Sequence, residues 1–191
     1  MPHMTKLEGP ALKAYLLLRR QMMLEGARIN NMDFKTAWDI PTPPSPAGLT
    51  YESLLPGPNA ALKITDLEPE DLGITVDAST EHGYLFNLTT TGENTNQVNK
   101  TIDNGRVVGI YGIHVKETAT VRLEQIDVNI GGREARVWPV RPVYDAQNNE
   151  LYFLDPIYVP EAKTLTIDMW AATSDASVRL TFLGLYVEPK E

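Results

Sequence analysis

Three histidines are the residues of this sequence best suited to metal binding or acid–base catalysis, but they stand far apart. His3, His82 and His114 belong to no His-x-His or His-Glu-x-x-His arrangement. A histidine site would have to be assembled from distant segments, so we expect solvated or packed side chains. The 191 residues include no cysteine, which excludes thiolate nucleophiles, zinc–thiolate sites and disulfides.

Serine, glycine and carboxylate patterns also lack the local order of an active site. No serine lies in a Gly-x-Ser-x-Gly elbow and no glycine-rich loop precedes a helix, so hydrolysis by serine and nucleotide binding have no local support. Glu68, Glu70 and Asp71 are residues of the type that cleaves glycosides, but they fall in a predicted turn of an acidic protein. We therefore predict a protein that is not an enzyme, with no catalytic, cofactor-binding or metal-binding residue and no cofactor.

Three further motifs suit binding. The stretch "DAQNNE", residues 145–150, offers oxygen ligands for calcium but lacks the spacing of a dedicated calcium loop, and we interpret it as a hairpin tip. Asn87 and Asn99 each begin a glycosylation sequon. Trp138 and Trp170 are candidates to stack on a sugar ring or on another chain, although packing within the fold is the simpler interpretation.

The charge and the N-terminal composition limit the partners. The formal net charge of −8, from 17 basic and 25 acidic residues, argues against a nucleic-acid-binding face. The apolar run in "AYLLLRRQMMLEG" is too short for a membrane span and wrongly ordered for a secretion signal. We therefore expect no nucleic acid and no membrane as partners, and a chain made in a cytoplasm that begins near Met1.

The first 58 residues are predicted to form a helix and an extended arm. A helix is expected from about Pro10 to Glu25, with Gly26 just past its end. Its apolar stripe packs either on the chain's own β domain or on a neighbouring subunit, and its basic residues fall largely elsewhere. The basic residues are Lys13, Arg19 and Arg20, and the stripe comprises Ala11, Leu12, Tyr15, Leu16, Leu18, Met22 and Met23. Six prolines between residues 40 and 58 favour an extended strap, either a surface linker or an arm on another molecule.

Residues 59–191 change to the twofold period of β-strands. A helical turn is expected over residues 65–73, hairpins at Asn104-Gly105, at Gly131-Gly132 and at "TSDAS", and a bulge near Glu124-Gln125. The predicted strands are Ala60–Thr65, Ile74–Ala78, Tyr84–Thr90, Arg106–Lys116, Thr118–Ile130, Ala135–Val140, Leu151–Val159, Leu165–Ala171 and Val178–Val187.

Alternation along the last two predicted strands shows which faces they bury. Residues 165–171 place Leu165, Ile167, Met169 and Ala171 on one face, which indicates one buried and one wetter side. The last strand is apolar on both sides in its second half, where residues 183, 185 and 187 oppose residues 182 and 186. We therefore predict a mainly β fold, an antiparallel two-sheet sandwich with jelly-roll topology, preceded by the helix and proline-rich arm.

Residues 84–189, and especially "LYFLDPIYVPEAKTLTIDMWAATSDASVRLTFLGLYVEP", resemble the small jelly-roll structural proteins of virus and bacteriophage particles. In this stretch an apolar strand leads into the connection "DPIYVP" and then into a hairpin whose last strand ends near the C-terminus. The resemblance implies a capsid subunit or a capsid decoration (cement) protein. It also implies a virion location after assembly in the host cytoplasm, a symmetric homo-oligomer, contacts with other capsid proteins, and no catalysis.

The alternative is a non-catalytic carbohydrate-binding β-sandwich module, in which Trp138, Trp170 and tyrosines contact a sugar. A small cupin-like enzyme would need clustered histidines and acids, which the sequence does not show. The assembly hypothesis accounts together for the amphipathic helix, the proline-rich strap, the acidic sandwich without a catalytic constellation and the doubly apolar last strand, whose outer surface needs a cover.

Overall fold

The computed structural model describes residues 7–75, 84–115, 123–146, 149–174 and 176–190. Its helices are α1 (Gly9–Ile29), α2 (Phe34–Trp38) and α3 (Arg141–Tyr144), with 3-10 turns at η2 (Pro46–Gly48), η3 (Glu52–Leu54) and η4 (Pro69–Leu72). Its strands are β1 (Leu62–Asp66), β2 (Leu85–Leu88), β3 (Gly92–Thr101), β4 (Val107–Val115), β5 (Leu123–Ile130), β6 (Arg133–Pro139), β7 (Glu150–Pro160), β8 (Thr164–Ala171) and β9 (Ala176–Pro189).

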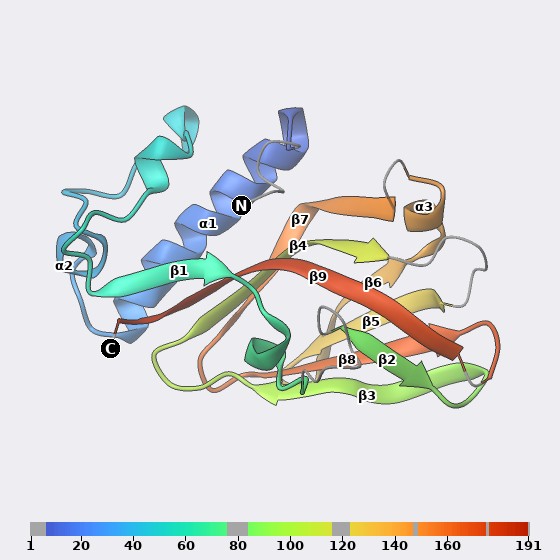
Figure 1. Ribbon diagram of the computed structural model, residues 1–191. Helices are drawn as coiled ribbons and strands as arrows, with labels where there is room; N and C mark the ends of the chain where they lie inside the picture. The colour runs from blue at the N-terminus through green and yellow to red at the C-terminus, as the bar shows by residue number, and fades with distance from the viewer. Residues whose placement is uncertain (1–6, 76–83, 116–122, 147–148, 175, 191) are drawn as a thin grey trace.

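The strands form two antiparallel sheets stacked as a sandwich (Figure 1). The first sheet has the order β1-β9-β4-β7, with β2 also paired to β9, and the second has the order β3-β8-β5-β6. Strand β2 pairs with β9, β3 with β8, β4 with β7 and β5 with β6. Strands β2 to β5 therefore pair with strands β9 to β6 in reverse order. Such an antiparallel double strand, folded into two sheets, is the topology of a jelly roll. The predicted mainly β sandwich is confirmed.

Several local predictions are also confirmed. The register of β5 against β8 shifts between Leu123 and Gln125, where a bulge was expected. Gly131 and Gly132 both have positive φ and join the paired strands β5 and β6, as a primed hairpin turn requires. The turn over residues 65–73 contains η4.

Other local predictions are wrong. The polar strand β3 was not predicted, because only Asn94 and Val98 within it are buried and no apolar alternation marks it. Ile74 and Thr75 are not in a strand, and the rest of that predicted strand lies outside the described residues. Neither Asn104-Gly105 nor "TSDAS" is a hairpin tip, since β3 and β4, like β8 and β9, belong to different sheets.

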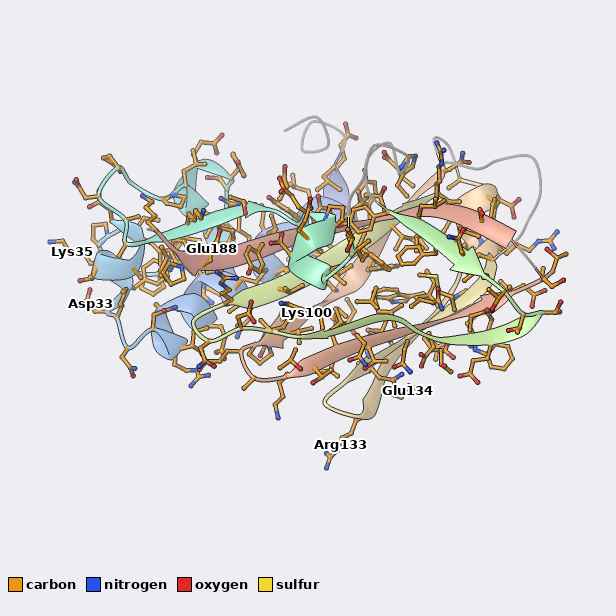
Figure 2. All side chains as sticks on the ribbon, turned by 60° about the horizontal axis from the view of Figure 1, so that its bottom comes forward. Asp33, Lys35, Lys100, Arg133, Glu134 and Glu188 are labelled. Carbon is orange, nitrogen blue, oxygen red and sulfur yellow. The ribbon has the colours of Figure 1, made fainter. Side chains whose placement is uncertain are left out.

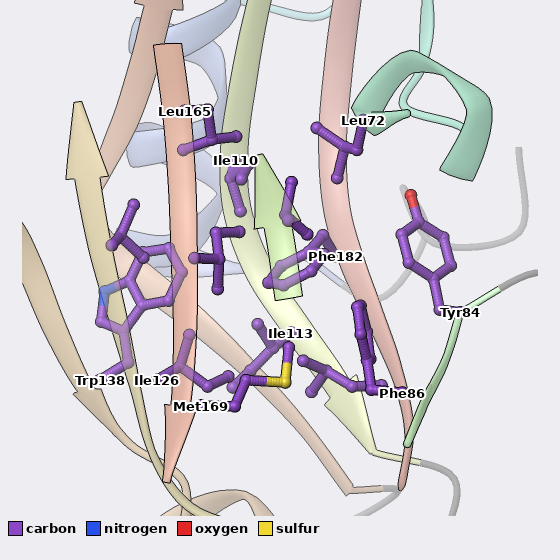
Figure 3. Packing of buried hydrophobic residues seen from close by; sticks show 14 of the residues in the cluster. Leu72, Tyr84, Phe86, Ile110, Ile113, Ile126, Trp138, Leu165, Met169 and Phe182 are labelled. Carbon is purple, nitrogen blue, oxygen red and sulfur yellow. The ribbon is translucent and has the colours of Figure 1, made fainter. Parts of the chain in front are cut away.

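The main hydrophobic core lies between the two sheets (Figure 3). The inward side chains of β8, Leu165, Ile167, Met169 and Ala171, all belong to it, as their alternation predicted. Phe182 of β9 contacts the rings of Tyr84 and Phe86 edge-on, at centroid distances of 5.9 and 6.2 Å.

A second hydrophobic cluster lies on the outer face of the first sheet, under α1. It joins Leu18, Met22 and Met23 of the helix to Val107 and Tyr111 of β4, and to Leu183, Leu185 and Val187 of β9. Tyr15 meets Tyr111 edge-on at 5.0 Å. The helix therefore packs on its own chain. It covers the apolar outer side of β9, for which a neighbouring subunit was the alternative cover.

Two glycines allow the helix to approach the sheet. A Cβ on Gly109 of β4 would collide with the sulfur of Met22, and a Cβ on Gly26 would lie 2.7 Å from Val187 Cγ1. The prediction that the helix ends at Gly26 is therefore wrong: the glycine serves close packing, and the helix continues to Ile29. The chain leaves the helix at Asn30 and Asn31, the latter with φ 53°.

The strap of residues 40–58 folds back along α1. Trp38, just before it, is fully buried and donates from Nε1 to the carbonyl of Met23 at 2.7 Å. Arg20 Nε donates to the carbonyl of Pro44 at 2.7 Å, and Leu54 is fully buried in the second cluster. Part of the strap forms the short turns η2 and η3, so the predicted extended chain is only partly correct. The described residues 7–58 and the sandwich share this second cluster.

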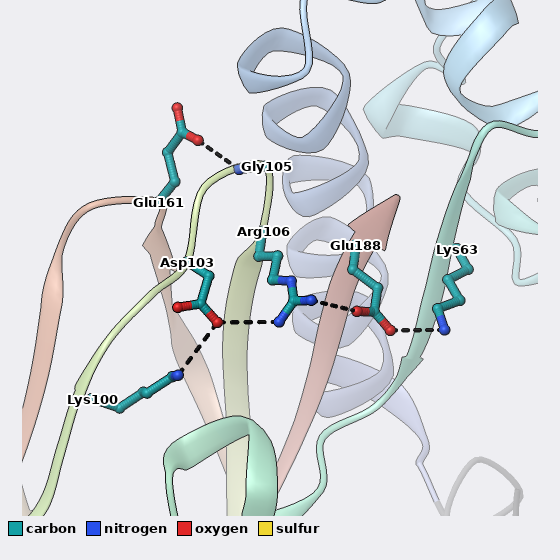
Figure 4. A network of polar contacts seen from close by, with 7 residues as sticks. All are labelled: Lys63, Lys100, Asp103, Gly105, Arg106, Glu161 and Glu188. Carbon is teal, nitrogen blue, oxygen red and sulfur yellow. Dashed lines mark hydrogen bonds and ion pairs between the residues drawn. The ribbon is translucent and has the colours of Figure 1, made fainter. Parts of the chain in front are cut away.

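A chain of ion pairs ties together the ends of β1, β4 and β9 (Figure 4). Asp103 accepts from Lys100 at 3.3 Å and from Arg106 at 3.1 Å, while Glu188 lies 3.5 Å from Arg106 and 2.8 Å from Lys63. Because these groups are partly exposed, we assign them to alignment of the strand ends more than to stability. No helix among the described residues is long and apolar enough to cross a bilayer.

The cis packing of α1 predicts a large cost for shortening Met22. Replacing Met22 with alanine should lower the free energy of unfolding by about 2–5 kcal/mol, because it opens a cavity between helix and β4. The matched control is Leu17→Ala on the exposed side of the same helix, which should cost on the order of 0.5 kcal/mol. Urea unfolding of both variants checks this, and equal, small effects would show that α1 is not part of the fold.

Candidate functional site

The outer face of the second sheet carries an exposed tryptophan among polar side chains. Because Ile167 and Met169 of β8 and Ile126 and Val128 of β5 point into the core, their sequence neighbours point outward. We call this set the polar face; its members are Gln125, Asp127, Asn129, Thr166, Asp168 and Trp170. Trp170 is 36% exposed.

Two carboxylates stand directly opposite each other on this face. Asp127 of β5 is the cross-strand partner of Asp168 of β8, a placement in which like charges repel. No ion pair with either carboxylate is found in the part of the chain that the structure describes. Arg133, in the same sheet, faces Ile130 near the β5–β6 turn (Figure 2), five positions and about 17 Å along the strand from Gln125.

Neutral donors hold the two carboxylates in place. Asp127 accepts from Trp170 Nε1 at 2.9 Å and from Gln125 Nε2 at 2.7 Å. Asp168 accepts from the backbone N–H of Asn96 at 2.6 Å and from Asn129 Nδ2 at 3.3 Å. Each carboxylate oxygen can accept a second hydrogen bond, so acceptor capacity remains beside the indole.

The strand registers place Trp170 between two polar neighbours. It faces Gln125 on β5 and Glu93 on β3. The backbone of β3 bulges between Asn94 and Val98, with Asn96 at φ 56°, and this bulge brings the N–H of Asn96 to Asp168. The indole is thus oriented by its own hydrogen bond to Asp127, and its ring is partly open to solvent.

The arrangement offers hydrogen-bond acceptors beside an aromatic ring. No group of three or more potential metal ligands occurs within the described ranges. The two carboxylates are bound to neutral donors, and no histidine of the described residues lies on this face. A ligand with hydroxyl donors and one flat apolar side would match both the acceptors and the ring.

The two tryptophans highlighted by the sequence have different surroundings. Trp138 is 6% exposed and stacks on Phe153 at a centroid distance of 4.0 Å and an interplanar angle of 18°. Together with the ion pair between Arg136 and Asp155, this stack joins the edge strands β6 and β7. The carbohydrate role considered for Trp138 is therefore not supported by its position, whereas Trp170 is accessible.

The other candidate residues do not converge on a site. His3 and His82 lie outside the described residues, and His114 is half-buried on β4, opposite Glu150. Glu68 and Asp71 cap the turn η4: the N–H of Glu68 donates to Asp71 Oδ2 at 2.8 Å.

The calcium and glycosylation motifs also remain apart from the polar face. In the "DAQNNE" stretch, residues 147 and 148 lie outside the described part, and Glu150 accepts from the Tyr152 hydroxyl at 2.7 Å. The sequon residues Asn87 and Asn99 are exposed, and both line a pocket of about 470 Å³ between β2 and β3.

Sequence reasoning missed the carboxylate pair. Asp127 and Asp168 are 41 positions apart and neither belongs to a motif. The available signal was that both sit on the wetter side of strands with an apolar other side. Pairing them required the register of β5 on β8, which the bulge at Gln125 determines.

The different burial of the three tryptophans makes their fluorescence a test of this site. Replacing Trp170 with phenylalanine should remove most of the emission that acrylamide quenches, because Trp38 and Trp138 are buried. The comparison variant Trp138→Phe should keep the quenchable emission. Unchanged quenching in the Trp170 variant would show that the indole is covered in solution.

Comparison with known proteins assigns no family to this chain. No family model matches, and no curated protein matches. Among solved structures, the insecticidal delta-endotoxin Cry8Ea1 from Bacillus thuringiensis aligns over 68% of this chain and 24% of its own, with 16% identity and a TM-score of 0.35.

Two further solved structures are more distant. A family 35 carbohydrate binding module from Clostridium thermocellum aligns over 67% of this chain and 99% of its own, with 14% identity and a TM-score of 0.27. An acetyl xylan esterase, Est2A, from Butyrivibrio proteoclasticus aligns over 69% and 33%, with 11% identity and a TM-score of 0.29. Likenesses this weak identify neither a family nor an activity for this chain.

Proposed function

We propose that this protein is a non-catalytic carbohydrate-binding β-sandwich that contacts its ligand through the polar face. The observation that carries the proposal is the exposed indole of Trp170, oriented by Asp127 and flanked by hydrogen-bond acceptors that have capacity to spare. A pyranose ring combines an apolar C–H side, which stacks on an aromatic ring, with hydroxyl donors for carboxylate and amide oxygens.

The negative charge of the polar face limits the class of sugar that it can bind. Asp127, Asp168 and Glu93 surround Trp170 without a cation bonded to either aspartate in the described structure. These carboxylates would repel an acidic sugar, and no ion pair among the described residues places a guanidinium on either aspartate. We therefore propose neutral polysaccharides as the ligand class.

Affinity electrophoresis in gels that contain single polysaccharides tests the proposal. At least one neutral glucan, mannan or xylan should retard the wild-type protein, and a uronate-rich pectin should not. Trp170→Ala should weaken the retardation by at least about tenfold, because it removes a central aromatic contact. Leu154→Ala, an exposed position on the other sheet, is the control and should bind as wild type. Equal retardation of the Trp170 variant, or none of the wild type, would contradict the proposal.

A second candidate function is that of a structural protein of a virus or phage particle, either forming or cementing the shell. The observation that favours it is Leu154, 69% exposed on β7, the free edge of the first sheet. Tyr158 on the same strand is also exposed. An apolar side chain held out from an edge strand suits a contact between copies of the chain, and capsid subunits share the jelly-roll topology with lectins.

Sedimentation velocity distinguishes this second function. If β7 mediates contacts between copies, the wild-type protein forms a closed oligomer, and Leu154→Glu shifts it to the monomer because a charge would enter an apolar contact. Leu154→Met, which keeps the apolar surface, should leave the oligomer intact. A wild-type protein that sediments as a monomer at all concentrations, and is absent from purified particles, would exclude a shell role.

A further inference from the structure

A nearly buried arginine lines a pocket between α1, the strap and β1. Arg19 is only 5% exposed, although the helical pattern had placed it away from the apolar stripe. The pocket is about 310 Å³ and is lined by Tyr15, Arg19, Tyr51, Ile64, Thr65, Asp66 and Glu68. We call it the Arg19 pocket. Its volume is at the lower end of the range for small-molecule sites.

The guanidinium of Arg19 makes two hydrogen bonds and has further N–H groups that could donate to a ligand. Nε donates to the carbonyl of Leu54 at 3.3 Å, Nη1 donates to the hydroxyl of Tyr15 at 3.3 Å, and the group lies 5.1 Å from the ring centroid of Tyr51. All these partners are neutral, and none of the ion pairs found among the described residues involves Arg19. Arginine has five N–H donors, and a buried charge without a counter-ion is costly.

Tyr15 does not supply the missing negative charge. Burial raises the pKa of its hydroxyl above the ordinary value, although Arg19 acts in the opposite direction. The phenol therefore stays neutral at physiological pH and accepts a hydrogen bond as an uncharged group. An anionic group on a ligand would satisfy the guanidinium better than anything that now touches it.

The lining of the same pocket also includes two acidic side chains. Asp66, at the end of β1, and Glu68 both line it, and neither is within ion-pair distance of Arg19. One cation and two anions leave the lining with a formal charge of −1. A phosphate or sulfate would be repelled by both carboxylates, whereas a ligand with one carboxylate and one ammonium group matches the guanidinium and the acids of the lining.

We propose that the Arg19 pocket binds a small zwitterion of the α-amino-acid class, with its carboxylate on the guanidinium of Arg19 and its ammonium group on Asp66 and Glu68. Tyr15, Tyr51 and Ile64 supply the apolar and aromatic wall for the rest of the ligand. The inference concerns a site on the helix side of the first sheet, and it is independent of the polar face.

Calorimetric titration of the full chain with glycine and with L-phenylalanine tests the proposal. At least one of the two should bind. For the amino acid that binds, its amide, which lacks the carboxylate, and its N-acetyl derivative, which lacks the ammonium group, should each bind at least about tenfold more weakly. Failure of both amino acids to bind, or equal binding of the blocked derivatives, would overturn the proposal.

Matched variants identify the groups involved. Arg19→Met should abolish binding without lowering the melting temperature, because it removes a buried charge and keeps the apolar stem. Asp66→Asn, at an exposed position, should weaken binding at least about tenfold and covers the case in which the Arg19 variant does not fold. Arg20→Met is the control, since Arg20 bonds to Pro44 and does not line the pocket. Retained affinity in the Arg19 or the Asp66 variant would refute the assigned contacts.

Discussion

The close approach of α1 to the outer face of the first sheet is the contact on which the rest of the structure depends. It requires the absence of a side chain at Gly109, where Met22 fills the space, and at Gly26, which meets Val187. With the helix in place, β9 is buried on both faces and the strap finds a surface along α1 through Trp38 and Leu54. Without it, the apolar side chains of β4 and β9 would face water.

This contact makes the two sheets unequal. The first sheet is covered by the core on one side and by the helix on the other, which explains the near-continuous burial of β4. Among the described residues, the second sheet is covered by the core on one side, and its outer face carries polar side chains and the partly exposed indole of Trp170. A ligand site on a sheet face is therefore available on the second sheet, and the helix layer instead encloses the Arg19 pocket at its boundary with β1.

The packing of α1 on the first sheet also bears on the two functional hypotheses. One of the sequence features that favour a particle protein is the second half of β9, which is apolar on both sides, and the chain's own helix accounts for that pattern. What remains for association between copies is the free edge at β7, where Leu154 is exposed. The outward position of Trp170 supports the carbohydrate hypothesis. Trp138 does not support it, because it is buried against Phe153.

The class of fold could be predicted from local alternation, because the buried residues of β8 recur at every second position, as in a strand with one buried face. The sequence by itself also placed the bulge at Gln125 and the Gly131-Gly132 hairpin, which depend on local chemistry. Tertiary structure alone decided where α1 docks, that Arg19 is buried, that polar β3 is a strand, and that Asp127 faces Asp168. Each of these depends on register or on contact between segments distant in sequence, which no local pattern encodes.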